Sequence, residues 1–513
     1  MRKGNALRDS NHYDFVIVGG GVGGLTLALL AGLNGHRVLL LEKSPALGGS
    51  LRRFKRNGIS LDTGFHFTGG LTQSGILTQM LRVLGMDGDI IADPITREED
   101  NRFILEAAGR VLSLPVGFEP MVNSLKRQFP REQVAIDTYF RLIREVNGNT
   151  ASLDLNTITE LTAADPFDST SLKDVLDSLT DDRDLKCVLC GYSMCYGVPN
   201  HEMSFANHAR VVFNMYERVA RVQRGGDAFL DAFIRQLKTV NVTVRPRTHI
   251  TECRDVENRR VGRFVLNTGE TVTTDHCVFT IHPRAVLETV SRANVSKAFA
   301  ARVENFEPSN GFFTLYAEVD DTPEIPPFQP AIISLFPIGE ADNLFTKHPD
   351  QRPLVIMKSR ELDQTGRPRN VLNAFELSHV DDVAAWTKTR LGDRPADYQA
   401  YKRRRVEHMT TRILTWYPEY RNHFHLLDSA SMLTFRDYLH SPYGCAYGIK
   451  QKMGQFNVFG RLPLKNVFAA GQNAALPGLV GTMLASFVIG RGLLGKDAFK
   501  AFISRRLKHT DPT

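Results

Sequence analysis

The chain has 513 residues, of which 42% are hydrophobic and 23% are charged, and its formal net charge is +7. This composition is typical of an ordinary globular protein and excludes both an intrinsically disordered chain and an integral membrane protein. The length is too great for a single hydrophobic core and predicts two intertwined domains.

The first predicted elements are a strand, a glycine-rich turn and a helix. Residues 15–18 are apolar and rich in β-branched side chains, which is typical of a buried parallel strand. Gly19, Gly21 and Gly24 follow in the spacing G-x-G-x-x-G, and residues 25–33 are predicted to be helical. Gly19 permits a tight turn, Gly21 lets a pyrophosphate approach the backbone, and Gly24 lets the helix pack closely on the strand. The N-terminus of the helix offers free N–H groups to the phosphates.

A second apolar strand, residues 37–42, completes a strand–helix–strand pattern and ends in Glu42. A carboxylate at this position can accept hydrogen bonds from ribose hydroxyl groups. These features together predict a dinucleotide-binding site. The loop that follows, residues 43–49, brings a second glycine pair, Gly48 and Gly49, back toward the phosphates.

A third strand, near the C-terminus, indicates which dinucleotide is bound. Residues 466–470 are predicted to form a buried strand that leads into Gly471 and Gln472, and residues 477–481 open a helix that runs to residue 494. A site that is completed by both ends of the chain suits a large cofactor of two parts. FAD fits better than NAD, because its ribityl chain and flavin ring extend across the domain to the N-terminus of the second helix.

These motifs resemble those of the FAD-dependent family of phytoene desaturases, carotenoid isomerases and retinol saturases, which is itself similar to the amine oxidases. The spacing from Glu42 to Gly49 and the Asp-Thr-Gly-Phe-His segment at 62–66 resemble the retinol saturase and carotenoid isomerase branch most closely. Residues 471–481 point to the same branch, and the retinol saturases are its nearest members. The resemblance spans about residues 13–495.

The resemblance implies a fold and a set of cofactor contacts. The fold class is α/β, with a Rossmann-like FAD-binding domain interleaved with an α+β substrate domain. The backbone near Ile250 would flank the adenine. The residues implied in cofactor binding are Gly19, Gly21, Gly24, Glu42, Lys43, Gly49, Ser50, Ile250, Gly471, Gln472, Val480 and Gly481.

Two positions depart from the family pattern. Ser50 follows the glycine pair where many relatives have arginine, so an arginine at the pyrophosphate would have to be Arg52 or Arg53. Gln472 stands where an acid usually follows the last-strand glycine, so the ribityl contact would be made by an amide. Gln472 resembles the retinol saturases in this respect, and neither departure removes FAD.

The expected domains are discontinuous. The FAD-binding domain is predicted in three parts and the substrate domain in the two segments between them, followed by a basic C-terminal tail. The FAD-binding parts are residues 13–95, 218–289 and 431–497, the substrate parts are residues 96–217 and 290–430, and the tail is 498–513. Apolar spacing predicts a helix over 225–237, and strands are expected at 242–244, 248–253, 263–266, 277–280 and 311–319.

The cysteines and the N-terminal residues indicate the expected cellular location of the protein. Cys187, Cys190 and Cys195 lie close together but lack the second pair or the histidines of a zinc site, so no metal site is predicted and reduced thiols are expected. Residues 1–12 are polar and have no apolar core of a signal peptide. Both features favour a reducing, cytoplasmic location.

The chain has no run of 18 apolar residues that would predict a membrane span, but its positive charge is uneven. Basic runs begin at Arg52, Lys402 and Arg505, and residues 498–507 mix apolar and basic side chains at helical spacing. Solvated helix faces are the default interpretation, and the alternative is peripheral binding to an anionic membrane surface. No motif for nucleic-acid binding is present.

The resemblance implies an FAD-dependent oxidoreductase that acts on carbon–carbon double bonds of an isoprenoid or polyene lipid. Saturation is favoured over desaturation and over cis–trans isomerisation; an amine-oxidase-type enzyme is the alternative, and a non-enzymatic FAD-binding scaffold is a third. His66 and Tyr447 are the candidate proton donors, against structural roles in capping a turn and packing under the flavin. Because only one strand–G-x-G-x-x-G–helix unit is found, the electron donor or acceptor is left open.

Overall fold

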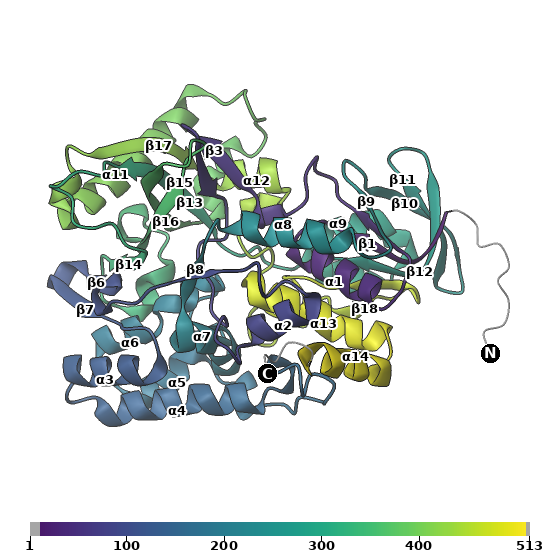
Figure 1. Cartoon of the computed structure of the whole chain (residues 1–513), viewed down its shortest axis with the longest axis horizontal. Helices are drawn as coiled ribbons and strands as arrows, with labels where there is room; N and C mark the ends of the chain where they lie inside the picture. The colour runs from purple at the N-terminus through teal and green to yellow at the C-terminus, as the bar shows by residue number, and fades with distance from the viewer. Residues whose placement is uncertain (1–10, 509–513) are drawn as a thin grey trace.

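The computed structural model describes residues 11–508. Figure 1 shows an eight-stranded sheet on the right, a seven-stranded sheet at the upper left and a group of helices at the lower left. The strands of the first sheet are β1 (His12–Val18), β2 (Val38–Leu41), β9 (Val242–Arg245), β10 (Ile250–Glu257), β11 (Arg260–Leu266), β12 (Thr271–Phe279), β18 (Gly460–Arg461) and β19 (Val467–Ala469).

This first sheet has a parallel centre. Its order is β10-β11-β12-β1-β2-β9, and β19 pairs in parallel with β12. β1 pairs in parallel with both β2 and β12, and α1 (Val22–Leu33) crosses from β1 to β2. β2 is buried along its whole length because helices and loops cover both faces of the sheet, which explains its continuous apolar sequence.

Two hydrophobic cores flank the first sheet. On one face pack α1, α2 (Ile76–Leu84), α8 (Gly226–Leu237), α13 (Gly478–Leu493) and α14 (Lys496–Lys508). The other face is covered by the β10–β11 hairpin, α9 (Pro283–Val290) and α10 (Lys297–Glu304). Segments from the start, the middle and the end of the chain therefore build one layered unit.

The seven-stranded sheet has the order β17-β13-β16-β15-β14-β6-β7. Its strands are β6 (Asn101–Leu105), β7 (Arg110–Ser113), β13 (Gly311–Val319), β14 (Ala331–Phe336), β15 (Leu354–Leu362), β16 (Pro368–Ser378) and β17 (Phe424–Ala430). The long helix α11 (Ala396–Trp416) packs on one face of the sheet, and α12 (Met432–Leu439) follows β17.

The remaining elements join these layers. The helical group consists of α3 (Phe118–Gln128), α4 (Gln133–Asn149), α5 (Leu172–Leu179), α6 (Arg183–Leu189) and α7 (Phe205–Arg218). Two small two-stranded sheets connect the parts: the hairpin of β3 (Arg53–Arg56) with β4 (Ile59–Asp62), and the long-range pair of β5 (Ala92–Pro94) with β8 (Ala220–Val222). The predicted fold class, a Rossmann-like α/β unit interleaved with an α+β unit, is confirmed.

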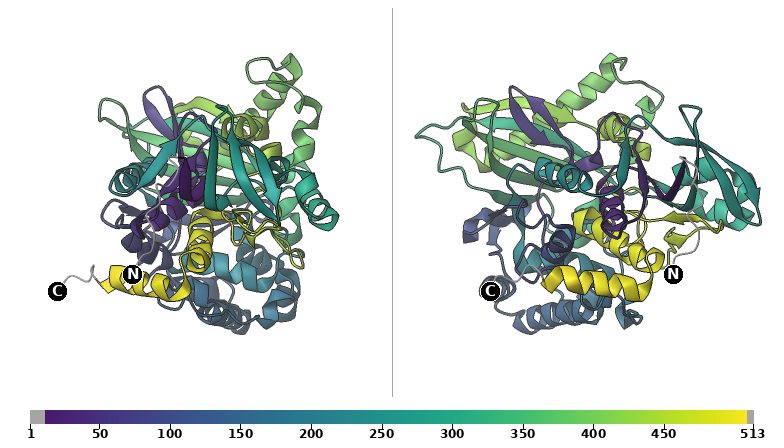
Figure 2. Two further views of the ribbon diagram at one scale, coloured as in Figure 1. Left: turned by 90° about the vertical axis from the view of Figure 1, so that its right-hand side faces the viewer. Right: turned by 45° about the vertical axis from the view of Figure 1, so that its right-hand side comes forward.

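The described part of the expected basic C-terminal tail is helical, because residues 496–508 form helix α14. Figure 2 shows this helix, in yellow, in the lower half of the molecule, above the blue helices. Its apolar residues Phe499, Phe502 and Ile503 are buried against α2 and α13 and are not available to lipid. Residues 509–513, and residues 1–10 of the segment expected to lack a signal peptide, lie outside the described residues.

The basic runs are also not simply solvated faces. Arg405 on α11 is buried and forms an ion pair at 2.6 Å with the buried carboxylate of Glu376. Arg53 lies on a strand and is buried among acidic side chains. The interpretation as solvated helix faces is therefore wrong for these two arginines. Among residues 11–508, no helix combines the length and the apolar character needed to cross a bilayer.

Candidate functional site

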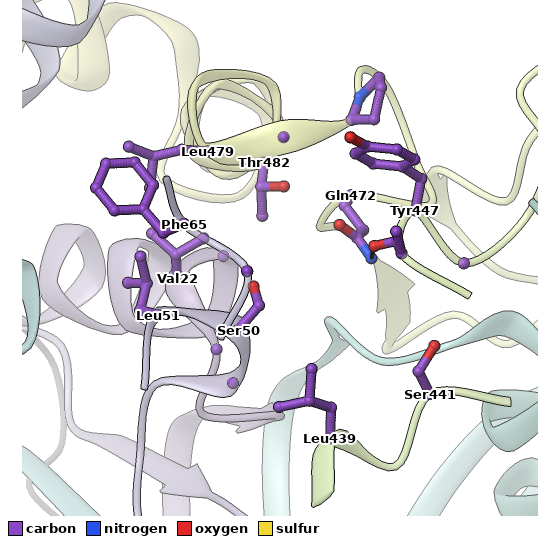
Figure 3. A pocket seen from close by; sticks show the side chains of 18 of the residues that line it. Val22, Ser50, Leu51, Phe65, Leu439, Ser441, Tyr447, Gln472, Leu479 and Thr482 are labelled. Carbon is purple, nitrogen blue, oxygen red and sulfur yellow. Dashed lines mark hydrogen bonds between the residues drawn. The ribbon is translucent and has the colours of Figure 1, made fainter. Parts of the chain in front are cut away.

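A single long cavity of about 610 Å³ connects the two sheets. It begins at the N-termini of α1 and α13, at the carboxyl ends of β1 and β2, and it ends over the seven-stranded sheet. Figure 3 shows part of its wall, with Val22 and Ser50 on one side and Tyr447 and Gln472 on the other. Crevices at the carboxyl ends of parallel strands are where α/β folds bind ligands.

The three glycines of the first turn have different neighbours. A Cβ atom on Gly24 would lie 1.8 Å from the carbonyl oxygen of Gly19, so helix and strand pack too closely for any side chain. Gly19 itself has a φ of +110°, which favours glycine. A Cβ atom on Gly21, by contrast, would meet nothing within 4 Å and would stand in the cavity. The space at Gly21 is therefore not explained by protein packing and fits a ligand that approaches the backbone.

The second glycine pair returns to the first turn as expected. The N–H of Gly48 donates to the carbonyl of Gly20 at 2.7 Å, and Gly48 and Gly49 both have positive φ angles. A Cβ atom on Gly49 would have Gly21 as its only neighbour, at 3.4 Å. Two glycine turns thus face each other at the N-terminus of α1, whose first turn has no side-chain cap. Such a cradle of backbone N–H groups suits a pyrophosphate.

Glu42 lies at the carboxyl end of β2 and lines the cavity. One carboxylate oxygen accepts the N–H of Gly20 at 2.7 Å, and the other accepts the N–H of Ser44 at 2.6 Å. Each oxygen keeps a lone pair for a further donor. The arrangement orients the carboxylate beside the glycine turn and leaves it able to accept ribose hydroxyl groups.

A second helix N-terminus opens into the same cavity. α13 begins at Gly478 after Pro477, and no side chain caps it. The hydroxyl of Ser486 donates to the carbonyl of Gly23 at 2.8 Å and holds α13 against α1. Gly481 sits where a Cβ atom would lie 2.4 Å from the Leu476 carbonyl oxygen, so packing alone requires this glycine. The two helix dipoles together favour an anionic or electron-rich ligand at both places.

The cavity brings together most of the residues predicted from the sequence. All of the predicted cofactor and proton-donor residues line it except Gly24 and Gly471. Gly471 lies behind the wall with a φ of +90°, where a Cβ atom would be 3.2 Å from the Thr280 carbonyl oxygen. The amide of Gln472 faces the cavity and is bonded only weakly, at 3.4 Å, to the carbonyl of Ala446.

The two arginines considered for the pyrophosphate differ. Arg52 lines the cavity and donates to the carbonyl oxygens of Gly49 and Tyr438. Arg53 does not line it, because its guanidinium pairs with Asp62 at 2.8 Å and with Glu361 at 2.6 Å. The expectation that Arg53 could serve the pyrophosphate is therefore wrong.

Arg53 belongs to a buried cluster of four charges that the sequence did not reveal. Glu361 on β15 also pairs with Arg221 on β8 at 2.6 Å, and Arg221 lies 3.4 Å from Asp62. All four side chains are at most 6% exposed. The cluster ties the β3–β4 hairpin to the seven-stranded sheet, directly before the loop that carries His66.

Breaking this cluster is expected to destabilise the protein strongly. Glu361→Ala leaves the buried Arg53 and Arg221 with one buried carboxylate, Asp62, in place of two, and breaking a buried ion pair in this way typically costs about 3–5 kcal/mol. Thermal unfolding of the FAD-loaded protein measures the effect. Glu145→Ala, which removes an exposed pair with Arg141, is the matched control and should cost no more than about 0.5 kcal/mol. Equal melting temperatures for the two variants would contradict the structural role of the cluster.

His66 lines the cavity beside Phe375. The two rings stack with centroids 5.0 Å apart, and within residues 11–508 the His66 Nδ1 atom has no hydrogen-bond partner. The pKa of His66 is lowered to about 4, mainly by burial; Asp62 opposes this shift, and the nearby Arg221 and Arg53 contribute to it. The imidazole is therefore neutral at physiological pH.

Tyr447 lies on a conformationally constrained loop. His440 and Tyr443 have φ angles of 54° and 61°, values that non-glycine residues adopt at a cost of about 1–3 kcal/mol and that cluster at functional sites. The N–H of Tyr447 donates to the Ser309 hydroxyl at 3.1 Å. Burial raises the pKa of the Tyr447 phenol well above its usual value, so the phenol keeps its proton.

A row of aromatic rings connects the two candidate proton donors. Tyr447 and Phe312 have ring centroids 6.3 Å apart, Phe312 and Phe375 are 5.4 Å apart, and Phe375 stacks on His66. Phe312 and Phe375 belong to the seven-stranded sheet. Both candidates therefore lie where the dinucleotide cradle meets the sheet.

The floor of the cavity could not be predicted from the sequence. The inward side chains of the sheet that line it are Phe312, Thr314, Ile332, Ser334, Val355 and Phe375. Polar and apolar side chains do not alternate in residues 331–336, because both faces of this strand are buried and, apart from Ser334, apolar. Only the three-dimensional structure shows which face the cavity uses.

The site predicts a measurable role for Glu42. Glu42→Ala should weaken FAD binding by about 1.5–3 kcal/mol, the range for hydrogen bonds to a charged group. Glu42→Gln keeps one carbonyl acceptor and should show a smaller loss. Titration of the apoprotein with FAD, followed by flavin fluorescence, measures both. Unchanged affinity in Glu42→Ala would mean that the carboxylate only orders the turn through Gly20 and Ser44.

Comparison with known proteins agrees with this geometry. The chain is 24% identical to all-trans-retinol 13,14-reductase of Danio rerio over 96% of this chain and 88% of that protein. It is 29% identical to the chloroplastic prolycopene isomerase of Daucus carota, but only over 29% of this chain and 24% of that protein. A solved structure of putrescine oxidase with putrescine bound has the same fold, with a TM-score of 0.62 at 16% identity, covering 95% of this chain and 99% of that one.

The family assignment comes from residues 22–329, which match the flavin-containing amine oxidoreductases. The matched region begins in the first glycine turn and ends after β13. The two facing glycine turns, the open space at Gly21 and the two uncapped helix N-termini all suit FAD. Because the match covers more than half of the chain, this protein belongs to the flavin-containing amine oxidoreductase family, and FAD is its cofactor.

Proposed function

We propose that this protein reduces a carbon–carbon double bond of an isoprenoid or polyene lipid, with FAD held between the two glycine turns and α13. The observation that carries the proposal is the character of the cavity beyond the dinucleotide cradle. Its floor is a broad, mainly apolar sheet face with aromatic rings, which suits an extended hydrocarbon chain.

The distribution of charge in the cavity disfavours an amine substrate. Among residues 11–508, the carboxylates that line the cavity are Glu42, at the end of β2, and Glu288, on α9. Both lie toward the eight-stranded sheet, and none lies on the floor. An alkylammonium group on the floor would be desolvated without an anionic partner, which is costly.

The relatives favour reduction over the other reactions of the family. Similarity to the retinol reductase extends over nearly the whole of this chain, whereas similarity to the prolycopene isomerase covers less than a third of it. Desaturation and isomerisation of the same class of lipid are the alternatives that the experiments must separate.

The bound cofactor and the residues of the cavity have different roles in the proposed reaction. Reduced FAD, when bound, supplies a hydride equivalent, and the cavity wall excludes water from the reacting bond. Tyr447 holds a proton at its phenol oxygen at neutral pH and is the better candidate to protonate the second carbon. His66, neutral and stacked on Phe375, orients the chain from the other end of the aromatic row.

An anaerobic mixing experiment tests the proposal. The bound flavin is reduced with light, and a polyene is then added in the absence of oxygen. Return of the oxidised flavin spectrum is the expected result. Persistence of the reduced spectrum together with an altered double-bond geometry would identify an isomerase, and bleaching of the oxidised enzyme by an amine would identify an amine oxidase.

We further propose that the protein collects this lipid at an anionic membrane surface through α14. Lys496, Lys500, Arg505 and Lys508 are exposed on this helix, while its apolar side is buried. Binding would therefore be electrostatic, reversible and without insertion, at about 1 kcal/mol for each basic residue near the surface.

Liposome flotation at low salt measures this association. We expect the protein to float with anionic vesicles and to remain behind with neutral ones. The double variant Lys500→Glu, Arg505→Glu should lose most of the binding, and the same reversal at the exposed Arg403 and Arg404 of α11 is the control. Recovery in the unbound fraction with both kinds of vesicle would reject the membrane proposal.

A further inference from the structure

One row of residues crosses the floor of the cavity from strand to strand. Thr314 on β13 faces Phe375 on β16, Phe375 faces Val355 on β15, and Val355 faces Ser334 on β14. All four line the cavity. Because neighbouring strands lie about 4.8 Å apart, Ser334 is about 10 Å from Phe375, the residue on which His66 stacks.

Ser334 lies near the closed end of this row. Its neighbour on the next strand is Phe103 on β6. Gly191 packs so closely over Phe103 that a Cβ atom there would be 2.0 Å from the ring. Gly191 and Tyr192 line the cavity at this point, so the chain of a substrate that follows the floor must end near Ser334.

The hydroxyl of Ser334 has no partner within the described part of the chain. The residue is 5% exposed, and no donor or acceptor in residues 11–508 bonds its Oγ atom. Its neighbours on the same face, Ile332 and Val355, are apolar. The hydroxyl therefore faces the cavity, where its hydrogen-bond partner must be water or a ligand, and a serine on this otherwise apolar stretch of wall points to a polar group of the ligand.

The other polar side chains that line the cavity indicate the charge of the ligand group that Ser334 would bind. Arg210 on α7 is the cation on the substrate side of the cavity, but its guanidinium is bonded to Asp168 at 2.6 Å and to Asn207 at 2.9 Å. Among residues 11–508, the other lysine and arginine that line the cavity are Lys43 and Arg52, which lie beside the glycine turns, so no unpaired lysine or arginine on the substrate side is left for a carboxylate or phosphate. A neutral oxygen, which accepts from or donates to a serine hydroxyl, fits best.

We propose that Ser334 is a specificity-determining residue that hydrogen-bonds a neutral oxygen at one end of the substrate, a hydroxyl or carbonyl group. The substrate class is then an oxygenated isoprenoid, and a hydrocarbon polyene would leave the Ser334 hydroxyl unpaired. This inference rests on the proposed function and adds to it the polar end of the substrate.

The test compares all-trans-retinol with its deoxy analogue, in which hydrogen replaces the hydroxyl group. Dissociation constants are measured from the change in the flavin spectrum of the FAD-loaded protein, in one detergent, so that partitioning of the two ligands cancels between variants. The wild-type protein should bind retinol about tenfold more tightly than the analogue. Ser334→Ala should bind both equally, and Ser334→Thr, which keeps a hydroxyl, should retain the preference.

Two further variants test whether the preference for retinol depends on Ser334 itself. Ile332→Val changes the apolar lining next to Ser334 and should weaken both ligands alike. Asn214 on α7 is a second buried polar residue that lines the cavity. If Asn214→Leu removes the preference while Ser334→Ala keeps it, the assignment to Ser334 is wrong. Equal binding of both ligands to the wild-type protein overturns the inference but leaves the reductase standing, and binding of neither overturns both.

Discussion

Replacing Gly21 by valine is expected to abolish FAD binding without unfolding the protein. The backbone at Gly21 has a φ of −75° and a ψ of 179°, which valine adopts without strain, and the new Cβ atom meets no protein atom within 4 Å. The side chain would occupy the approach of the pyrophosphate and displace its hydrogen bonds to the backbone. Loss of two such bonds, each about 1.5–3 kcal/mol, weakens binding by at least about 100-fold.

The neighbouring glycines provide the controls. Gly24→Ala places a methyl group against the Gly19 carbonyl and should disrupt the fold itself. Gly88→Val, at an exposed position that also has open space, should bind FAD normally. Flavin content and the melting temperatures of the apoproteins distinguish these outcomes. A Gly21→Val protein that keeps its flavin would show that the cofactor does not lie over this turn.

Removing the Tyr447 hydroxyl is expected to slow the reaction by about 10²–10⁴-fold, the usual range for loss of a general acid. Tyr447→Phe keeps the ring that packs near Phe312, so FAD content and lipid affinity should not change. The rate of flavin reoxidation in a single turnover isolates this step. Tyr443→Phe is the matched control, because Tyr443 lies on the same loop but its hydroxyl bonds Arg284 and does not line the cavity.

The pH dependence separates Tyr447 from His66. The pKa of His66 is lowered to about 4 and the pKa of Tyr447 is raised, so neither group changes protonation between about pH 5.5 and pH 8. The single-turnover rate should therefore be flat in this range. An inflection near pH 6.5 that disappears in His66→Gln would assign the proton to His66 instead.

The dinucleotide cradle was predictable because its parts are local. β1, the Gly19–Gly24 turn, α1 and β2 are continuous in sequence, and each glycine has a steric reason that a short pattern records. The C-terminal strand and α13 were predictable for the same reason, as a strand followed by a glycine-rich helix start. The family resemblance then related these distant segments to one cofactor.

The rest of the site depends on long-range pairing that a single sequence does not show. Nothing in the sequence indicates that Arg53 and Arg221 are buried against Glu361, a residue far along the chain. Ser334 lies in a wholly buried strand, so no alternation marked the face that meets the cavity. α14 combined apolar and basic residues, and only packing against α2 and α13 shows that its apolar side is covered.

The most direct test of the reductase is the mass of the product from a single anaerobic turnover. The enzyme, with its flavin fully reduced, is mixed with all-trans-retinol. The lipid is then extracted, and its molecular mass is measured by mass spectrometry. The expected result is one molecule that has gained two hydrogen atoms for each flavin that is reoxidised, and none with Gly21→Val. A product of unchanged mass, or one that has lost hydrogen when the oxidised enzyme is used, would contradict reduction.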